Sequence, residues 1–169
     1  MRSHTEAQRQ GGIEGYMKFY PEFRIIEAVR KLLENHVNKI LGSFEYQIPL
    51  IEFSSGYSGS VINPLISLTT CERTEKERII RQDAYNITIN FNIPETPESE
   101  LHCYVYSGAV SKAIYDNPTL DGIADKTVIT GKKYTSPKTP NCGEVWELVI
   151  RLRVKLENAQ LYRQKQGVI

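Results

Sequence analysis

Two segments of the chain alternate between apolar and polar residues, and this pattern constrains the fold more than any other feature. They are AYNITINFNIP, residues 84–94, and VWELVIRLRVKLE, residues 145–157. A period of two places successive side chains on opposite faces of a strand. Each segment therefore predicts a long β-strand with one apolar face. The two apolar faces comprise Tyr85, Ile87, Ile89, Phe91 and Ile93, and Trp146, Leu148, Ile150, Leu152, Val154 and Leu156.

These apolar faces need a cover, because their burial would contribute roughly 15–30 kcal/mol before conformational entropy opposes it. Two segments with helical patterns can supply it. In residues 21–41, apolar residues recur at steps of three and four, and Gly42 follows as a helix stop. The stripe expected to face the core is Ile26, Val29, Leu33, Val37 and Ile40.

The second predicted helix begins at Thr96 as N-cap, with Pro97 at the first helical position, and runs to about Tyr115. Gly108 lies inside it at a cost of about 1 kcal/mol in helix propensity, so we expect another element to pack closely there. Asn117-Pro118 ends this helix, because the residue before a proline disfavours the α region. The chain then turns through Leu120-Asp121-Gly122 and returns as a strand over 126–134.

The order of helix, strands, helix and strands predicts an α+β fold with an antiparallel-rich, mixed β-sheet and both α-helices on one face. Residues 17–169 are expected to form a single domain, and residues 1–16, polar and glycine-containing, a flexible N-terminal extension. Two further strands are predicted, in EYQIPLIEF and in LISLTTCERTEKERIIRQ, and the second segment also contains a charged turn near Glu72–Glu77.

The composition argues against several functions. A formal net charge of +1 excludes binding of nucleic acid by bulk attraction, and three cysteines without a C-x-x-C favour reduced thiols over a zinc site. The FSSGYSGS loop lacks the lysine and the following helix of a phosphate-binding loop. The side chains of His102 and Cys103 point in different directions, because they are adjacent on a predicted helix, which argues against a Cys–His nucleophile. The sequence therefore predicts a non-enzyme with no catalytic residue, cofactor, metal ion or membrane span.

The candidate interface residues are mostly basic. On the polar face of the last strand, Arg151, Arg153 and Lys155 form a row. This row is a solvated surface with cross-strand ion pairs, a contact surface between subunits, or a surface facing nucleic acid. The other candidates are Arg78 and Arg81, which could join the row, and Tyr57 in the loop 53–64.

The element order and the segment NPTLDGIADKTVITGKKY together resemble phage and prophage tail-terminator proteins, also called tail completion or minor tail proteins. The resemblance covers Pro21 to Glu157. The family often has two successive glycines in this motif, whereas Asp121 precedes the glycine here. The matching positions are Asn117, Pro118, Leu120, Gly122, Ile123 and Ala124.

The resemblance implies a structural virion protein that forms a ring, in related proteins a hexamer, at the head-proximal end of the tail tube. The ring would end tube polymerisation and join the tail to the head. The implied partners are further copies of the chain, the tail-tube protein, the head–tail connector, and DNA passing through the lumen without sequence recognition. The implied locations are the virion tail and, during assembly, the host cytoplasm. Gly122 would supply the backbone geometry of a rigid turn.

Two alternatives remain open at this stage. One is a head-closure or neck connector protein of the same particle. The other is a small-ligand or nucleotide-binding enzyme that uses the loop 53–64. A ring-forming protein should have a large native mass, whereas a binding protein should be stabilised by its ligand.

Overall fold

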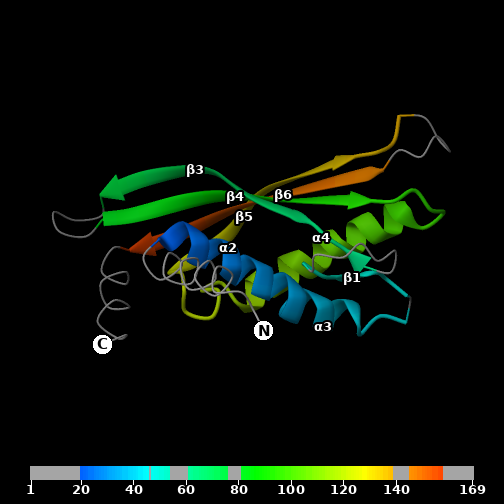
Figure 1. Cartoon of the computed structure of the whole chain (residues 1–169), viewed down its shortest axis with the longest axis horizontal. Helices are drawn as coiled ribbons and strands as arrows, with labels where there is room; N and C mark the ends of the chain where they lie inside the picture. The colour runs from blue at the N-terminus through cyan, green and yellow to red at the C-terminus, as the bar shows by residue number, and fades with distance from the viewer. Residues whose placement is uncertain (1–19, 46, 54–60, 76–80, 139–144, 158–169) are drawn as a thin grey trace, which may run out of the picture.

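The computed structural model describes residues 20–45, 47–53, 61–75, 81–138 and 145–157. They form one α+β domain, in which two helical segments lie on one side of a four-stranded antiparallel sheet (Figure 1). This confirms the predicted fold class. The predicted N-terminal extension, residues 1–16, lies outside the described residues. Within the described part, no helix is both long enough and apolar enough to cross a membrane.

The main sheet has the order β3-β4-β6-β5, and every neighbouring pair is antiparallel. Its strands are β3 (Leu65–Glu75), β4 (Arg81–Ile93), β5 (Lys126–Thr135) and β6 (Trp146–Glu157). In the central pair, Ile89 lies opposite Ile150 and Ile87 opposite Leu152. The apolar residues expected to face the core on these two strands are all buried except Trp146, which is half-buried. The predicted strand faces are therefore confirmed.

The first helix is continuous but contains a π-helical segment. It consists of α2 (Pro21–Lys31), η1 (Leu32–Val37) and α3 (Asn38–Leu41). Ile26 and Ile40, expected on the core stripe, are only half-buried. The π segment, with i→i+5 hydrogen bonds, adds a residue to its turn and so keeps a four-residue spacing on one face. The buried residues at that spacing are Ile25, Val29, Leu33, Val37 and Leu41.

A small parallel sheet is attached to this helix. Strand β1 (Leu50–Ile51) pairs with β2 (Val61–Ile62) and not with the main sheet. The side chain of Asn38 donates to the Ile51 carbonyl and accepts from the Ile51 amide, each at 2.7 Å. The strand predicted in EYQIPLIEF is therefore only two residues long, because side chains of the helix satisfy its backbone.

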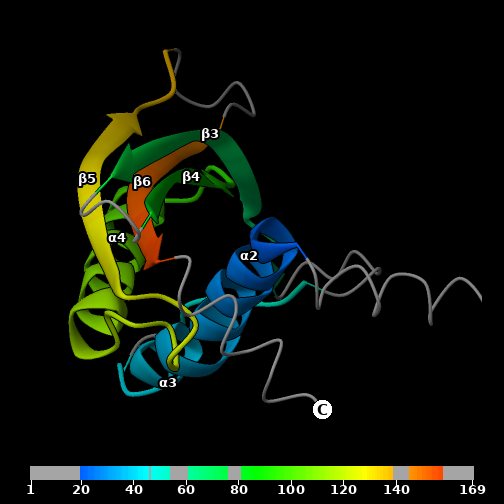
Figure 2. The same cartoon turned by 90° about the vertical axis from the view of Figure 1, so that its left-hand side faces the viewer.

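The second helix, α4 (Ser99–Asp116), begins later than predicted. The N-cap residue is Glu98 and not Thr96, whose hydroxyl accepts from the Glu98 amide in the turn that precedes the helix. Gly108 is exposed, and a Cβ there would meet nothing within 4 Å, so the expected close packing at this glycine is wrong. Helix α4 contacts β5 and β6, whereas α2 contacts β3, so each helix covers a different edge of the sheet (Figure 2).

The assignment of strand faces can be tested with a pair of substitutions on β6. Leu152 is fully buried, whereas Val149 is half-buried on the polar face. Leu152→Asp should destabilise the protein by about 4–5 kcal/mol or more, because a carboxylate would be buried without a partner. Val149→Asp should change stability by only about 1 kcal/mol. Urea denaturation followed by circular dichroism measures both, and equal effects would contradict the assignment.

Candidate functional site

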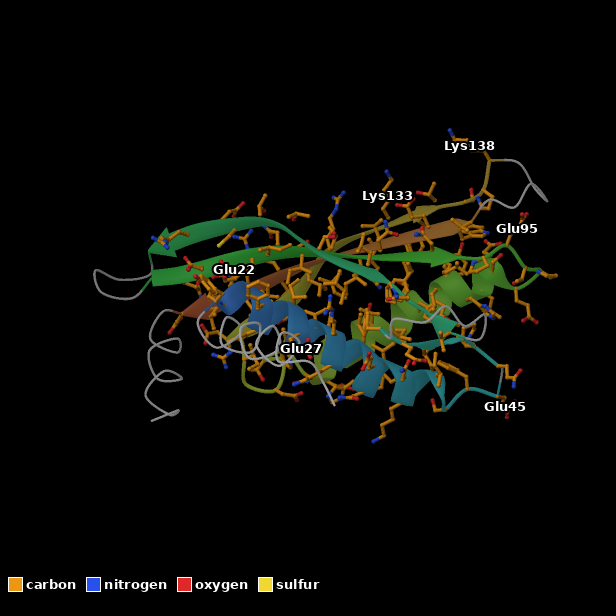
Figure 3. The ribbon with its side chains drawn as sticks, in the orientation of Figure 1. Glu22, Glu27, Glu45, Glu95, Lys133 and Lys138 are labelled. Carbon is orange, nitrogen blue, oxygen red and sulfur yellow. The ribbon has the colours of Figure 1, made fainter. Side chains whose placement is uncertain are left out.

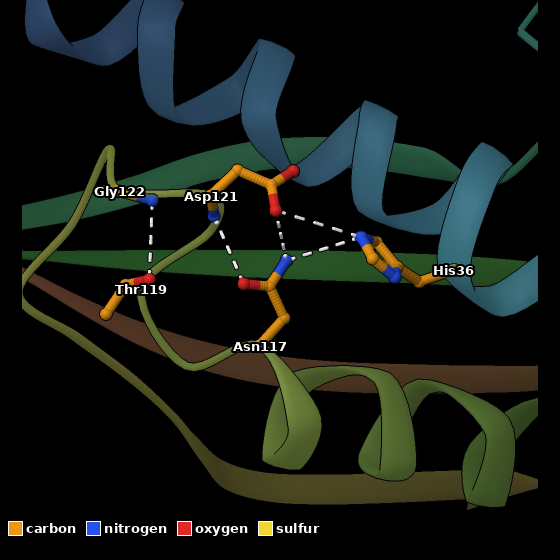
Figure 4. Close-up of polar contacts among 5 residues, drawn as sticks. All are labelled: His36, Asn117, Thr119, Asp121 and Gly122. Atoms are coloured by element: carbon orange, nitrogen blue, oxygen red, sulfur yellow. Dashed lines mark hydrogen bonds and ion pairs between the residues drawn. The ribbon is translucent and has the colours of Figure 1, made fainter.

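The turn between α4 and β5 contains the residues that carry the sequence motif, and it is held by its own side chains (Figure 4). The Asn117 side chain accepts from the Asp121 amide at 3.2 Å and donates to the Asp121 carboxylate at 3.0 Å. The Thr119 hydroxyl accepts from the Gly122 amide at 3.3 Å. Pro118 is exposed. Asn117 and Thr119 thus supply side-chain acceptors for the backbone amides of the turn.

Three consecutive residues of this turn have left-handed backbone conformations. Their φ angles are 49° at Leu120, 57° at Asp121 and 84° at Gly122. Glycine adopts such values without strain, but a leucine does so rarely, so Leu120 must be held there by its surroundings. Its side chain is only 1% exposed, so the core anchors this position. The sequence predicts such geometry at Gly122 only, and not at the two residues before it.

The turn also contacts the first helix through His36, which lies in the π segment (Figure 4). The His36 Nε2 atom lies 3.4 Å from the Asn117 Nδ2 atom and 3.9 Å from a carboxylate oxygen of Asp121. The motif therefore connects α4, η1 and the start of β5. No group of three or more potential metal ligands occurs among the described residues.

The polar face of the sheet is basic. Arg151, Arg153 and Lys155 alternate with buried residues of β6, as the sequence pattern predicts. Lys126 and Lys133 of β5 share this face, and Lys133 points away from the helices (Figure 3). Sequence reasoning missed these two lysines, because only the pairing of β5 with β6 brings them beside the row.

The charges on this face are only partly neutralised. Arg153 forms an ion pair with Glu72 of β3 at 3.0 Å. The Arg151 guanidinium makes no ion pair with any described residue. Arg81 is the first residue of β4, opposite Glu75, but its side chain is outside the described part, as are Tyr57 and Arg78. The structure therefore brings together three of the six predicted interface residues.

Both cysteines of the described part have thiols whose pKa is raised above the ordinary value. Burial raises the pKa of the Cys103 thiol to about 11, so this thiol stays protonated at neutral pH. Its neighbour His102 lies 3.7 Å from Glu98 across one helical turn, not beside the thiol. Cys71 is exposed, and desolvation is the main cause that raises its thiol pKa.

Comparison with known proteins adds no family assignment to this geometry. No protein-family model matches the chain, and no curated protein matches it.

The backbone strain in the turn can be measured with two glycines that differ only in conformation. A Cβ would meet nothing within 4 Å at either Gly122 or Gly108. Gly122→Ala should therefore destabilise by about 1–2 kcal/mol through its positive φ alone. Gly108→Ala, in the middle of α4, should stabilise by about 0.5–1 kcal/mol. The midpoints of urea denaturation show whether each substitution stabilises or destabilises the protein. A neutral Gly122→Ala would mean that the turn relaxes freely.

Proposed function

We propose that this protein is a ring-forming structural subunit of a phage or prophage tail, acting at the head-proximal end of the tail tube to end polymerisation and to provide the surface for head joining. The observation that carries the proposal is the open sheet. Both edge strands, β3 and β5, lack a strand partner on their outer side among the described residues, and the helices cover only one face. The resemblance of the motif at 117–124 and of the element order supports the same function.

The two free edges suit a head-to-tail contact between copies. Because all neighbouring strands are antiparallel, β3 and β5 run in opposite directions. In a copy rotated about an axis roughly parallel to the strands, β5 would therefore meet β3 in antiparallel orientation. The two edges also have similar lengths, 11 residues in β3 and 10 in β5. Repeating this contact around a cyclic axis would close the sheet and leave no edge.

Irregularities in the edge strands favour a specific partner over uncontrolled pairing. The register of β3 shifts between Leu68 and Thr70, and that of β5 shifts between Ile129 and Gly131. Such β-bulges are a common protection of sheet edges against aggregation. Only a strand with a compatible register can pair with them, which fits an assembly that stops at a closed ring.

The uncovered face would line the lumen of the ring. When a sheet closes on itself, helices packed on one face lie on the outer circumference, as in other barrels with an outer helical layer. The polar face, with Arg151, Lys126 and Lys133, would then face the axis. A lumen with basic and amide side chains attracts the phosphate backbone without reading the sequence. The rigid corner at 117–122 would hold α4 and β5 in fixed relation at the contact.

The formation of a ring can be tested by measuring the native mass of the protein. The full chain should give one discrete oligomer by native mass spectrometry, either alone or on addition of tail-tube protein. It should also be found at tube ends by electron microscopy, with tube growth arrested. A neck connector would form a ring but would not stop tube growth. A monomer that leaves tube growth unchanged would overturn the proposal.

The orientation of the basic face can be tested by charge reversal at Arg151, which makes no ion pair with any described residue. Arg151→Glu should leave the ring and its stability intact but weaken binding of linear duplex DNA. The slope of log affinity against log salt should become shallower by about 0.9 for each phosphate that Arg151 neutralises. Fluorescence anisotropy measures this slope, with Lys39→Glu on α3 as the control. If both variants bind DNA alike, the face does not line the lumen.

A further inference from the structure

Lys132 is a half-buried cation for which the described part of the chain provides no carboxylate. It lies on β5 on the side that faces α4, opposite Ile150. Its Nζ atom donates to the Ser107 hydroxyl at 2.8 Å, to the Ser107 carbonyl at 3.2 Å and to the Ser111 hydroxyl. All three partners are neutral oxygens, and desolvation lowers the pKa of Lys132. A cation in such surroundings is stabilised when a carboxylate approaches it.

The bulge in β5 is the reason that Lys132 occupies this place. Lys126 and Lys133 both lie on the polar face, although they are an odd number of positions apart and would lie on opposite faces of a regular strand. This is possible only because the register shifts between Ile129 and Gly131. Without the bulge, Lys132 would point to the polar face and Lys133 to the helices. The bulge therefore directs one particular lysine toward α4.

The hydrogen bonds around Lys132 leave one donor for an outside acceptor. An ammonium group only donates, so the Ser107 hydroxyl accepts from Lys132. The Ser107 hydroxyl proton then has one remaining partner among the described residues, the Tyr134 hydroxyl at 2.6 Å. Either hydroxyl can donate in this bond, and in the arrangement in which Ser107 donates to the Tyr134 oxygen, the phenolic proton of Tyr134 is available for another acceptor. Tyr134 as a whole is 42% exposed.

The nearby carboxylate of α4 is already engaged. Glu100 accepts from the Tyr104 hydroxyl at 2.9 Å, and the Tyr104 ring packs edge-on against the Tyr134 ring, with centroids 5.7 Å apart. Tyr104 is 50% exposed, and the surface beside Gly108 is open. The result is an exposed site with two tyrosine rings, a polarised phenol and a cation behind it.

We propose that Lys132, Ser107 and Tyr134 form a receptor for a carboxylate of a second copy of this chain, in the head-to-tail contact of the ring. The inference rests on the proposed function, because continuation of the sheet places the α2/β3 side of one copy beside the α4/β5 side of the next. Glu22 and Glu27 of α2 are the carboxylates on that side (Figure 3). Neither makes a hydrogen bond or an ion pair with a described residue. Helix α2 also carries Arg24, Arg30 and Lys31, so the complementarity is that of the Lys132 cation with these two carboxylates and not of the two sides as a whole.

The test is assembly of the full chain carrying Lys132→Met or Tyr134→Phe. Each variant should keep the circular dichroism spectrum of the folded wild type, yet raise the concentration for half-maximal ring formation by about tenfold or more. Lys39→Met removes one exposed charge from α3 and should assemble like the wild type. If Lys132→Met fails to fold, Tyr134→Phe, which removes only the hydroxyl, decides the question.

A mixing experiment identifies the partner carboxylates. Copies with Lys132→Glu and copies with Glu22→Lys and Glu27→Lys should each assemble poorly alone. In an equal mixture, every contact of an alternating ring is again complementary, so assembly should return. Assembly that is lost but not restored by mixing would overturn Glu22 and Glu27 as the partners.

The outcomes separate this inference from the proposed function. A wild-type ring together with unchanged assembly of Lys132→Met and Tyr134→Phe would overturn the receptor and leave the ring in place. A wild-type chain that forms no ring, alone or at tube ends, would overturn both.

Discussion

The antiparallel pairing of β4 with β6 is the interaction on which the rest of the structure depends. It runs from Gln82 opposite Glu157 to Ile93 opposite Trp146, and its apolar face contacts α4 and shares one buried core with the first helix. Phe91 stacks on Tyr106 of α4 with ring centroids 5.3 Å apart. Because side chains alternate, a slip of one residue in this pair would expose the whole core face. The register of two central strands therefore fixes where the helices pack and which residues remain outside.

The sequence predicts this pair well because its signal is local. The two strands alternate almost without interruption, so their existence, length and faces follow from the period alone. The edge strand β5 is different. Its sequence KTVITGKKYT alternates weakly, and the bulge reverses the face of every residue after it. A bulge is set by pairing with β6, so the positions of Lys132 and Lys133 could not be predicted from their spacing.

The first helix and the turn between α4 and β5 also have features that could not be predicted from the local sequence. The residues that are buried in the first helix recur every four positions, and this spacing is visible in the sequence. The periodicity of an ideal α-helix, however, predicts that the stripe through Ile26 and Ile40 faces the core. The π segment packs against α4 and β1, and it places His36 beside the turn. In that turn, glycine at 122 is a local signal of positive φ, whereas Leu120 adopts it because its side chain is buried. Tertiary contacts, and not local preference, decide both features.

The two edges of the sheet differ in how their buried charges are neutralised. The two sides of the molecule are therefore electrostatically different. At the β3 edge, the buried carboxylate of Asp83 is matched within the chain by Arg73 of β3 at 3.2 Å. At the β5 edge, the half-buried ammonium of Lys132 has only neutral oxygens around it. A contact between two like edges would place two such cations together without a carboxylate. In the proposed ring, a contact between unlike edges would bring the cation toward the carboxylates of α2, which is the electrostatic reason for proposing head-to-tail association over a symmetric pair.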